Sequence, residues 1–224
     1  MVEFDTIRAS PPLTAYIKKP KGTGPFPAVI VFMHRPGNDN AMQKVVDDLA
    51  KAGLVGVCHD SYRNETIRET YNDQTIFEDF EASLKYVKDL EYVDANKVSI
   101  MGFCMGGRHA YLAAARYPEL KSVVAFYGFP GQGTEPSATP MNVVSDMSMP
   151  VLGIFGRQDH LFPFEDVEQF RELLHKQSTN NKVVVYDDVG HGFLNPYSPK
   201  RHLDGVSAGK AWNETITFYR KYFS

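Results

Sequence analysis

The chain has little cysteine and no long apolar run, and these absences exclude several protein classes. Its 224 residues contain two cysteines, Cys58 and Cys104, too few for a disulfide framework. No window approaches the roughly 18 continuous apolar residues of a membrane span. Residues 1–5 are acidic and lack the apolar core of a signal peptide. We therefore expect no membrane association, and we expect a cytoplasmic location.

An excess of basic charge is also missing. The 24 Lys and Arg residues are outnumbered by 27 Asp and Glu residues, for a formal net charge of −3. Because no basic block is present, we expect no nucleic-acid partner. No glycine-rich stretch carries the Lys-Ser/Thr of a phosphate loop. His59 and His160 each adjoin an Asp, but no metal-binding spacing includes them. The sequence predicts no metal, no cofactor and no obligate protein partner.

The patterns that are present predict an α/β protein. A hydrophobic content of 43% over 224 residues suits one globular domain, residues 1–224. Strand-like and helix-like segments alternate, which is typical of a mostly parallel central sheet with helices on both faces in three layers. The expected helices span residues 40–52, 75–90, 105–117, 164–176 and 207–222. The strands that we expect span residues 2–9, 13–18, 28–33, 54–58, 97–100, 149–156 and 182–186.

Cys104 lies in the most informative motif of the chain. The β-branched strand before it runs into Gly102-Phe103-Cys104-Met105-Gly106, and a predicted helix follows. This Gly-x-Cys-x-Gly arrangement matches a nucleophile elbow in which a thiol replaces the usual serine hydroxyl. The other interpretation is an inert, tightly packed cysteine, which is the ordinary state of an unpaired thiol.

An acid and a base follow Cys104 in the order that the elbow architecture requires. Asp159 comes just after the strand 149–156, and His191, between two glycines, comes just after the strand 182–186. A thiol nucleophile needs a base to remove its proton and an acid to orient that base. Asp187 and Asp188 are the rival acids, but we interpret them as solvated turn residues. The sequence therefore predicts a triad of Cys104, Asp159 and His191.

With these motifs, nearly the whole chain resembles the dienelactone hydrolase family of the α/β-hydrolase superfamily. The resemblance is carried by the Gly-x-Cys-x-Gly-Gly elbow, by Gly156-x-x-Asp159-x-x-x-Pro163, and by Gly190-His191-Gly192-Phe193. It implies hydrolysis of a small ester or lactone through an acyl-thiol intermediate. We expect the oxyanion to be held by the backbone N–H of Met105. The loop 34–40 should supply a second donor, which we assign to Arg35 because Pro36 has no N–H.

The substrate-binding candidates are Arg35, Tyr62, Arg63, Phe193 and Asn195. Family members often carry Glu where Arg35 stands, and the chlorocatechol-pathway members carry Arg near the place of Asn195, so dienelactone itself is a doubtful substrate. Three interpretations of Arg35 are open. Its positive charge favours the thiolate form of Cys104, or it binds a carboxylate on the substrate, or it is a solvent-exposed charge. The Gly- and Pro-rich stretch 128–140 is either a loop at the site mouth or a plain surface connection. The alternative function is a catalytically silent protein that binds a ligand or senses redox state through Cys104.

Overall fold

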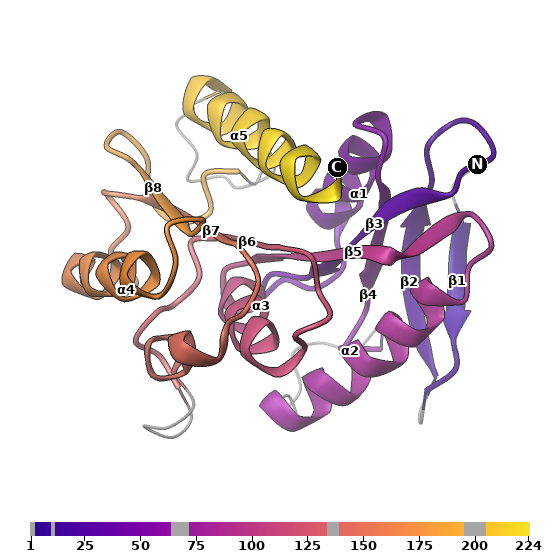
Figure 1. Ribbon diagram of the computed structural model, residues 1–224, viewed down its shortest axis with the longest axis horizontal. Coiled ribbons are helices and arrows are strands. Elements are labelled where there is room, and N and C mark those ends of the chain that lie inside the picture. The colour runs from indigo at the N-terminus through magenta and orange to yellow at the C-terminus, as the bar shows by residue number, and fades with distance from the viewer. Residues whose placement is uncertain (1–2, 10–11, 64–71, 134–138, 195–204) are drawn as a thin grey trace. The chain divides into compact units, whose positions relative to one another are not determined.

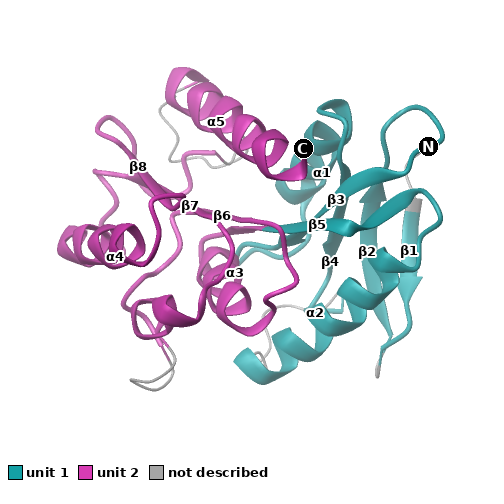
Figure 2. Ribbon diagram, in the orientation of Figure 1, with its two compact units in different colours: residues 1–100 teal, residues 101–224 magenta. Residues whose placement is uncertain are grey.

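The computed structural model describes residues 3–9, 12–63, 72–133, 139–194 and 205–224 (Figure 1). The chain divides into two compact units, residues 1–100 and 101–224 (Figure 2). The boundary falls inside one long strand. The expectation of a single domain over 1–224 stays a prediction.

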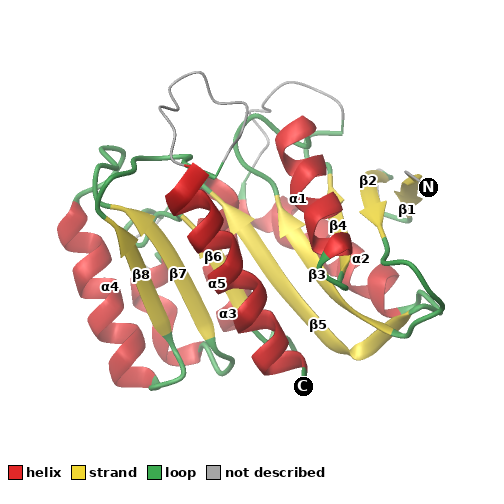
Figure 3. Cartoon of the chain, turned by 90° about the horizontal axis from the view of Figure 1, so that it is seen from above, coloured by secondary structure: helices red, strands yellow, loops and turns green. Residues whose placement is uncertain are grey.

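The first unit is built on the strand order β1-β2-β4-β3-β5. β1 and β2 are antiparallel, as are β2 and β4, whereas β3 and β4 run parallel with Ala28 opposite Val55. Helices α1 and α2 cover opposite faces of this sheet (Figures 1 and 3). The elements are β1 Glu3–Ile7, β2 Leu13–Lys18, β3 Phe26–Phe32, α1 Asn40–Lys51, β4 Val55–His59, α2 Asp73–Lys88 and β5 Val93–Phe103.

Both helices of the first unit begin at side-chain caps. The Asp39 carboxylate accepts hydrogen bonds from Ala41 N (2.9 Å) and Met42 N (3.2 Å) at the start of α1. Asn72 and Thr75 form a reciprocal capping box at the start of α2. Such caps satisfy N–H groups that have no carbonyl partner inside the helix. They explain why α2 begins at Asp73, two residues before the start predicted from hydrophobic spacing.

The second unit begins with the end of β5 and has the strand order β5-β6-β7-β8. β6, β7 and β8 are parallel, with Val123 opposite Val151 and Leu152 opposite Lys182. Helix α5 covers one face, and α3 and α4 cover the other (Figure 3). The elements are α3 Met105–Arg116, β6 Val123–Phe126, the 3₁₀ helix η2 Pro140–Asp146, β7 Val151–Gly156, α4 Phe164–Gln177, β8 Lys182–Tyr186 and α5 Gly205–Phe223.

These elements confirm the predicted fold class, an α/β arrangement of mostly parallel strands with helices on both sides. The five predicted helices are present, and their bounds differ from the predicted ones by at most two residues. The two cysteines form no disulfide with each other. Among the described helices, none is both long enough and apolar enough to cross a membrane.

Candidate active site

Cys104 occupies a strained turn between β5 and α3. Its backbone has φ 56° and ψ −120°, in a region that residues with a Cβ rarely adopt. A Cβ at Gly102 would lie 2.0 Å from the carbonyl oxygen of Gly106, so only glycine allows the strand and helix to cross this closely. The Cys104 N–H donates to the Phe126 carbonyl oxygen at 3.0 Å, which fixes the turn to β6. The turn presents a partly exposed thiol, whereas the Cys58 thiol on β4 is fully buried.

Asp159 and His191 meet across two neighbouring strand ends of the second unit. Asp159 Oδ2 lies 2.7 Å from His191 Nδ1. The other carboxylate oxygen of Asp159 accepts the Leu161 N–H at 3.0 Å, and the residue is 5% exposed. The approach depends on Gly156, where a Cβ would lie 2.3 Å from the Val189 carbonyl oxygen. Both oxygens of the carboxylate are thus engaged, which holds the imidazole ring in one orientation.

The second ring nitrogen of His191 is left for the thiol. Nε2 is buried and has no hydrogen bond of good geometry in the described part of the chain. Burial lowers the pKa of His191, but the hydrogen bond to Asp159 and the interaction with the Cys104 side chain outweigh it and raise the pKa from 6.5 to about 9. The environment therefore favours the imidazolium form, which is the partner that a thiolate needs.

The two rival acids have other partners. The Asp187 carboxylate, 79% exposed, pairs with the Arg157 guanidinium. Asp188 accepts from the Ser207 hydroxyl at 3.0 and 3.1 Å. Asp159 is the carboxylate that bonds His191 Nδ1 and orients the ring.

Aromatic rings surround the His191 imidazole. Ring centroids lie 4.9 Å away for Tyr127, 5.5 Å for Phe129 and 6.4 Å for Phe162. Sequence reasoning missed all three, because aromatic residues in loops are common and carry no spacing signal. Their one shared feature is that each follows a buried strand, β6 or β7, within six residues. Together they cover part of the imidazole, whose side chain remains 20% exposed.

Phe193 lies in the core beside this cluster. It is 4% exposed, and its ring packs on Tyr127 and Tyr186, each at 5.8 Å, and on Phe126 at 6.4 Å. Phe193 thus packs on Tyr127, one of the rings that contact His191. A direct contact of Phe193 with the substrate stays a prediction. Asn195 lies outside the described residues.

The two predicted oxyanion donors belong to different units. Met105 is the first residue of α3, where a backbone N–H has no carbonyl partner in its own helix. Arg35 is exposed in the loop between β3 and α1 of the first unit. That loop is closed by a hydrogen bond from Gly37 N to the His34 carbonyl oxygen at 2.9 Å. The joint use of these two N–H groups stays a prediction.

Tyr62 and Arg63 follow β4 in the first unit. Tyr62 is 4% exposed, and its N–H donates to Asp60 Oδ1 at 3.0 Å. The Arg63 guanidinium makes two hydrogen bonds, of 2.7 and 3.1 Å, to the Asp79 carboxylate on α2. Since Asp79 already balances this charge, a substrate carboxylate would have to compete with it for Arg63. The contacts favour a structural role for Arg63, and its substrate role stays a prediction.

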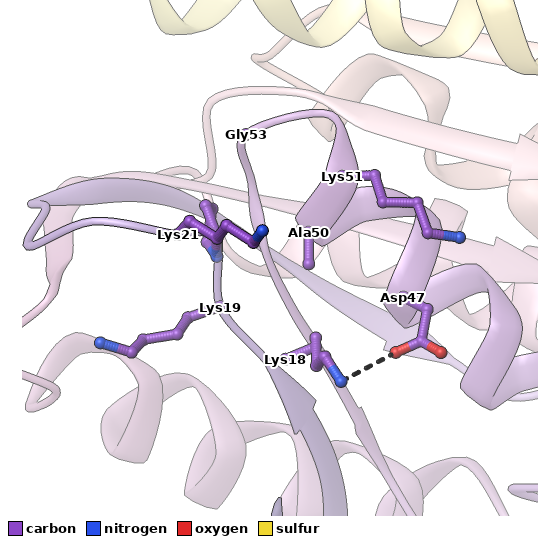
Figure 4. A pocket seen from close by; sticks show the side chains of 8 residues that line it. Lys18, Lys19, Lys21, Asp47, Ala50, Lys51 and Gly53 are labelled. Atoms are coloured by element: carbon purple, nitrogen blue, oxygen red, sulfur yellow. Dashed lines mark ion pairs between the residues drawn. The ribbon is translucent and has the colours of Figure 1, made fainter. Parts of the chain in front are cut away.

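A lysine-rich cavity lies elsewhere in the first unit. It measures about 590 Å³ and is lined in part by Lys18, Lys19, Lys21, Lys51 and Asp47. Lys18 pairs with Asp47 at 3.7 Å, and the side chains of Lys19 and Lys51 point in opposite directions (Figure 4). The lysines therefore do not converge on one point, and the cavity contains none of the triad residues. In the described ranges no group of three or more His, Cys, Asp or Glu residues is arranged to hold a metal ion.

Comparisons with known proteins find similarity over nearly the whole chain. The family model described as "Dienelactone hydrolase family" matches residues 13–223. A Yersinia pestis protein named "Putative carboxymethylenebutenolidase" is 32% identical over 228 residues, which cover 94% of this chain and 84% of that protein.

Solved structures show the same fold. The crystal structure titled "Putative Dienelactone Hydrolase" from Klebsiella pneumoniae superposes with a TM-score of 0.90 at 26% identity, covering 99% of each chain. Esterase 2 of Thermogutta terrifontis superposes with a TM-score of 0.81 at 18% identity, covering 98% of this chain and 94% of that one. The first likeness accompanies clear sequence similarity, and the second is a likeness of fold.

Proposed function

Because the chain belongs to the dienelactone hydrolase family and is a hydrolase, we propose that it cleaves small esters or lactones through a triad of Cys104, His191 and Asp159. The observation that carries the proposal is the 2.7 Å contact between Asp159 Oδ2 and His191 Nδ1 beside the Cys104 elbow. Nucleophilic catalysis by a thiol requires a base beside the thiol and an acid that orients this base. Here a buried carboxylate orients an imidazole next to a cysteine whose backbone is strained.

In the first half-reaction, His191 Nε2 takes the thiol proton and Cys104 Sγ attacks the carbonyl carbon of the substrate. The resulting oxyanion accepts hydrogen bonds from the N–H of Met105 and, in this proposal, of Arg35. Losing one such donor typically costs about 3 kcal/mol of transition-state stabilisation. The tetrahedral intermediate collapses when His191 returns the proton to the leaving alkoxide. The alcohol departs, and the acyl group remains on sulfur as a thioester.

In the second half-reaction, His191 removes a proton from water, which attacks the thioester carbonyl carbon. Collapse of this second intermediate breaks the C–S bond and returns the proton to the Cys104 sulfur. The carboxylic acid is released, and the free enzyme is restored. For a lactone substrate, the alcohol and the acid are two ends of one product.

The proposed substrate class is a small ester or lactone. The relatives' name, carboxymethylenebutenolidase, denotes a lactone hydrolase, and Arg35 is exposed in the proposed oxyanion loop. Its guanidinium is suited to bind a carboxylate on the substrate through two hydrogen bonds. We propose the cytoplasm as the compartment, because both thiols are free and a reducing compartment keeps them so.

The test is steady-state hydrolysis of an aryl acetate and of a carboxylated lactone. Wild type should turn over many times, and Cys104→Ala should abolish turnover. Cys58→Ala is the matched control, since it removes the other thiol, which is fully buried, and should leave turnover intact. If Arg35 anchors a carboxylate, Arg35→Ala should raise KM for the lactone alone.

Two results would contradict the proposal. The first is a Cys104→Ala variant that hydrolyses both substrates at the wild-type rate. The second is wild type that acquires one acyl group per chain, seen by intact mass spectrometry, without release of further acid. That second result would support the ligand-binding alternative.

A further inference from the structure

Leu161 is a large apolar side chain that is left in solvent beside the triad. It is 60% exposed, although most large apolar side chains of the described chain are buried. Its position is not a free loop tip, since its N–H donates to Asp159 Oδ1 at 3.0 Å. The carboxylate that orients His191 therefore also fixes the backbone of Leu161. The backbone of Leu161 is thereby held next to the acid, and its apolar side chain stays in contact with solvent.

Leu161 directly precedes, in the sequence, one of two aromatic rings that reach the proposed catalytic base. The next residue, Phe162, packs edge-on against Phe129 with ring centroids 5.4 Å apart. Both rings also contact the His191 imidazole, at 6.4 and 5.5 Å. We define the apolar strip as Leu161, Phe162 and Phe129.

Both charged side chains between the end of β7 and Leu161, those of Arg157 and Asp159, are already paired. Arg157 bonds the Asp187 carboxylate, and its guanidinium lies over the Phe164 ring at 4.5 Å. Asp159, the other charged residue of the loop, bonds His191. The strip itself is apolar, and the exposed imidazole of His160 directly precedes it in the sequence.

The chemistry of the triad says which part of a substrate meets the strip. His191 must hand its proton to the leaving oxygen, so that oxygen lies within hydrogen-bond reach of the imidazole. The alcohol part of an ester is attached to this oxygen. Side chains next to the imidazole therefore contact the alcohol part before they contact the acyl part.

We propose that Leu161 is a specificity-determining residue that favours esters with an apolar alcohol part. This inference rests on the proposed hydrolase function and names the substrate class of that same site. Burying the exposed leucine against an apolar group removes both surfaces from water, which stabilises the bound state. A substrate with the same apolar group on its acyl side gains nothing from this contact.

Two isomeric esters distinguish a contact with the alcohol part from a contact with the acyl part. Benzyl acetate carries a phenyl ring on the alcohol side, and methyl phenylacetate carries it on the acyl side, with the same atoms in total. Methyl acetate, which lacks the ring, reports on the chemistry alone. Acid release would be followed with a pH indicator for wild type and for the Leu161→Ser, Leu161→Met and Phe4→Ser variants. Phe4 is the matched control, because it is 64% exposed on β1 of the first unit.

Leu161→Ser should lower kcat/KM for benzyl acetate by about tenfold, the size expected when one apolar contact is lost. Its kcat/KM for methyl phenylacetate and methyl acetate should stay within about twofold of wild type, since those contacts are unchanged. Leu161→Met, which keeps an apolar side chain, should restore benzyl acetate hydrolysis, and Phe4→Ser should behave as wild type.

The outcomes distinguish the two proposals. The first contrary result is a Leu161→Ser variant that hydrolyses benzyl acetate as well as wild type does. The second is a variant whose kcat/KM falls equally for both isomers. Either result means that Leu161 does not select for the alcohol part, while the hydrolase function stands. If wild type hydrolyses none of the three esters but turns over the aryl acetate or the carboxylated lactone, this inference fails and the hydrolase function stands. If it hydrolyses none of the five substrates, both proposals fail.

Discussion

The pairing of Asp159 with His191 predicts a specific loss when only the charge of the acid is removed. Asp159→Asn keeps the shape of the side chain but replaces the carboxylate that bonds Nδ1 at 2.7 Å. The rise in the His191 pKa from 6.5 to about 9 corresponds to about 3 kcal/mol in favour of the imidazolium. Burial lowers this pKa, so without the carboxylate only the Cys104 side chain remains to raise it. We expect the pKa of His191 to fall well below 9 in the variant.

Two assays follow this change. The rate at which iodoacetamide alkylates Cys104, measured between pH 5 and 9, reports how readily the thiol gives up its proton. At pH 7 it should fall at least about tenfold in Asp159→Asn, because one pH unit of pKa is a factor of ten. Turnover of an aryl acetate should fall by roughly 10²–10⁴, as expected when the base loses its orienting carboxylate. Asp187→Asn, which removes an exposed acid from the His191 segment, should leave both rates at wild-type values. Equal behaviour of the two variants would refute the assignment of Asp159.

The same pKa sets a pH dependence of stability. His191 is protonated more readily in the folded chain than in the unfolded chain, so its contribution is complete below about pH 6.5 and is lost as the pH rises towards about 9. The free energy of unfolding of wild type, relative to Asp159→Asn, should therefore decrease over this interval. A difference that stays constant from pH 6 to pH 9.5 would contradict the ion-pair account.

Three further predictions concern the stability of the fold. Gly102→Ala should destabilise the fold by at least about 3 kcal/mol, because its Cβ would meet the Gly106 carbonyl oxygen at 2.0 Å. Gly209→Ala in helix α5 meets nothing within 4 Å and should stabilise the fold by about 0.5–1 kcal/mol. Urea unfolding measures both, and a loss at Gly102 no larger than the usual surface effect would argue against the close crossing. Asp39→Ala should cost about 1 kcal/mol in the same assay, whereas Asp39→Ser, which keeps a capping oxygen, should cost less.

The elements of the fold were predictable because local patterns determine them. Period-two apolar runs gave β8 at residues 182–186, and helical spacing gave α1 and α3 to within one residue at their ends. The start of α2 was two residues off, since it depends on a capping box rather than on apolar spacing. The order of the strands in the sheets could not be read from periodicity, because it depends on which strand ends pack together.

For the site, the residue types and their order along the chain were enough to propose Cys104, Asp159 and His191. These local signals can be recognised without knowing any tertiary contact. They are the glycine pair of the elbow, an acid after one strand and a histidine after the next. The rings of Tyr127, Phe129 and Phe162 were not predictable, because nothing local distinguishes them from other loop aromatics. The engagement of Arg63 by Asp79, 16 residues away along the chain, was likewise hidden.

The amino-acid sequence by itself determined the alternation of strands and helices, the glycines that permit the turn at Cys104, and the residue types that we propose as nucleophile, acid and base. These follow from backbone preferences and side-chain chemistry, which act over a few residues. Tertiary structure alone decided which acid bonds the imidazole, how far its pKa rises and which side chains shield it. Those properties depend on distances of a few ångströms between segments about 30 residues apart, such as Asp159 and His191, and such distances exist only once the strands have packed.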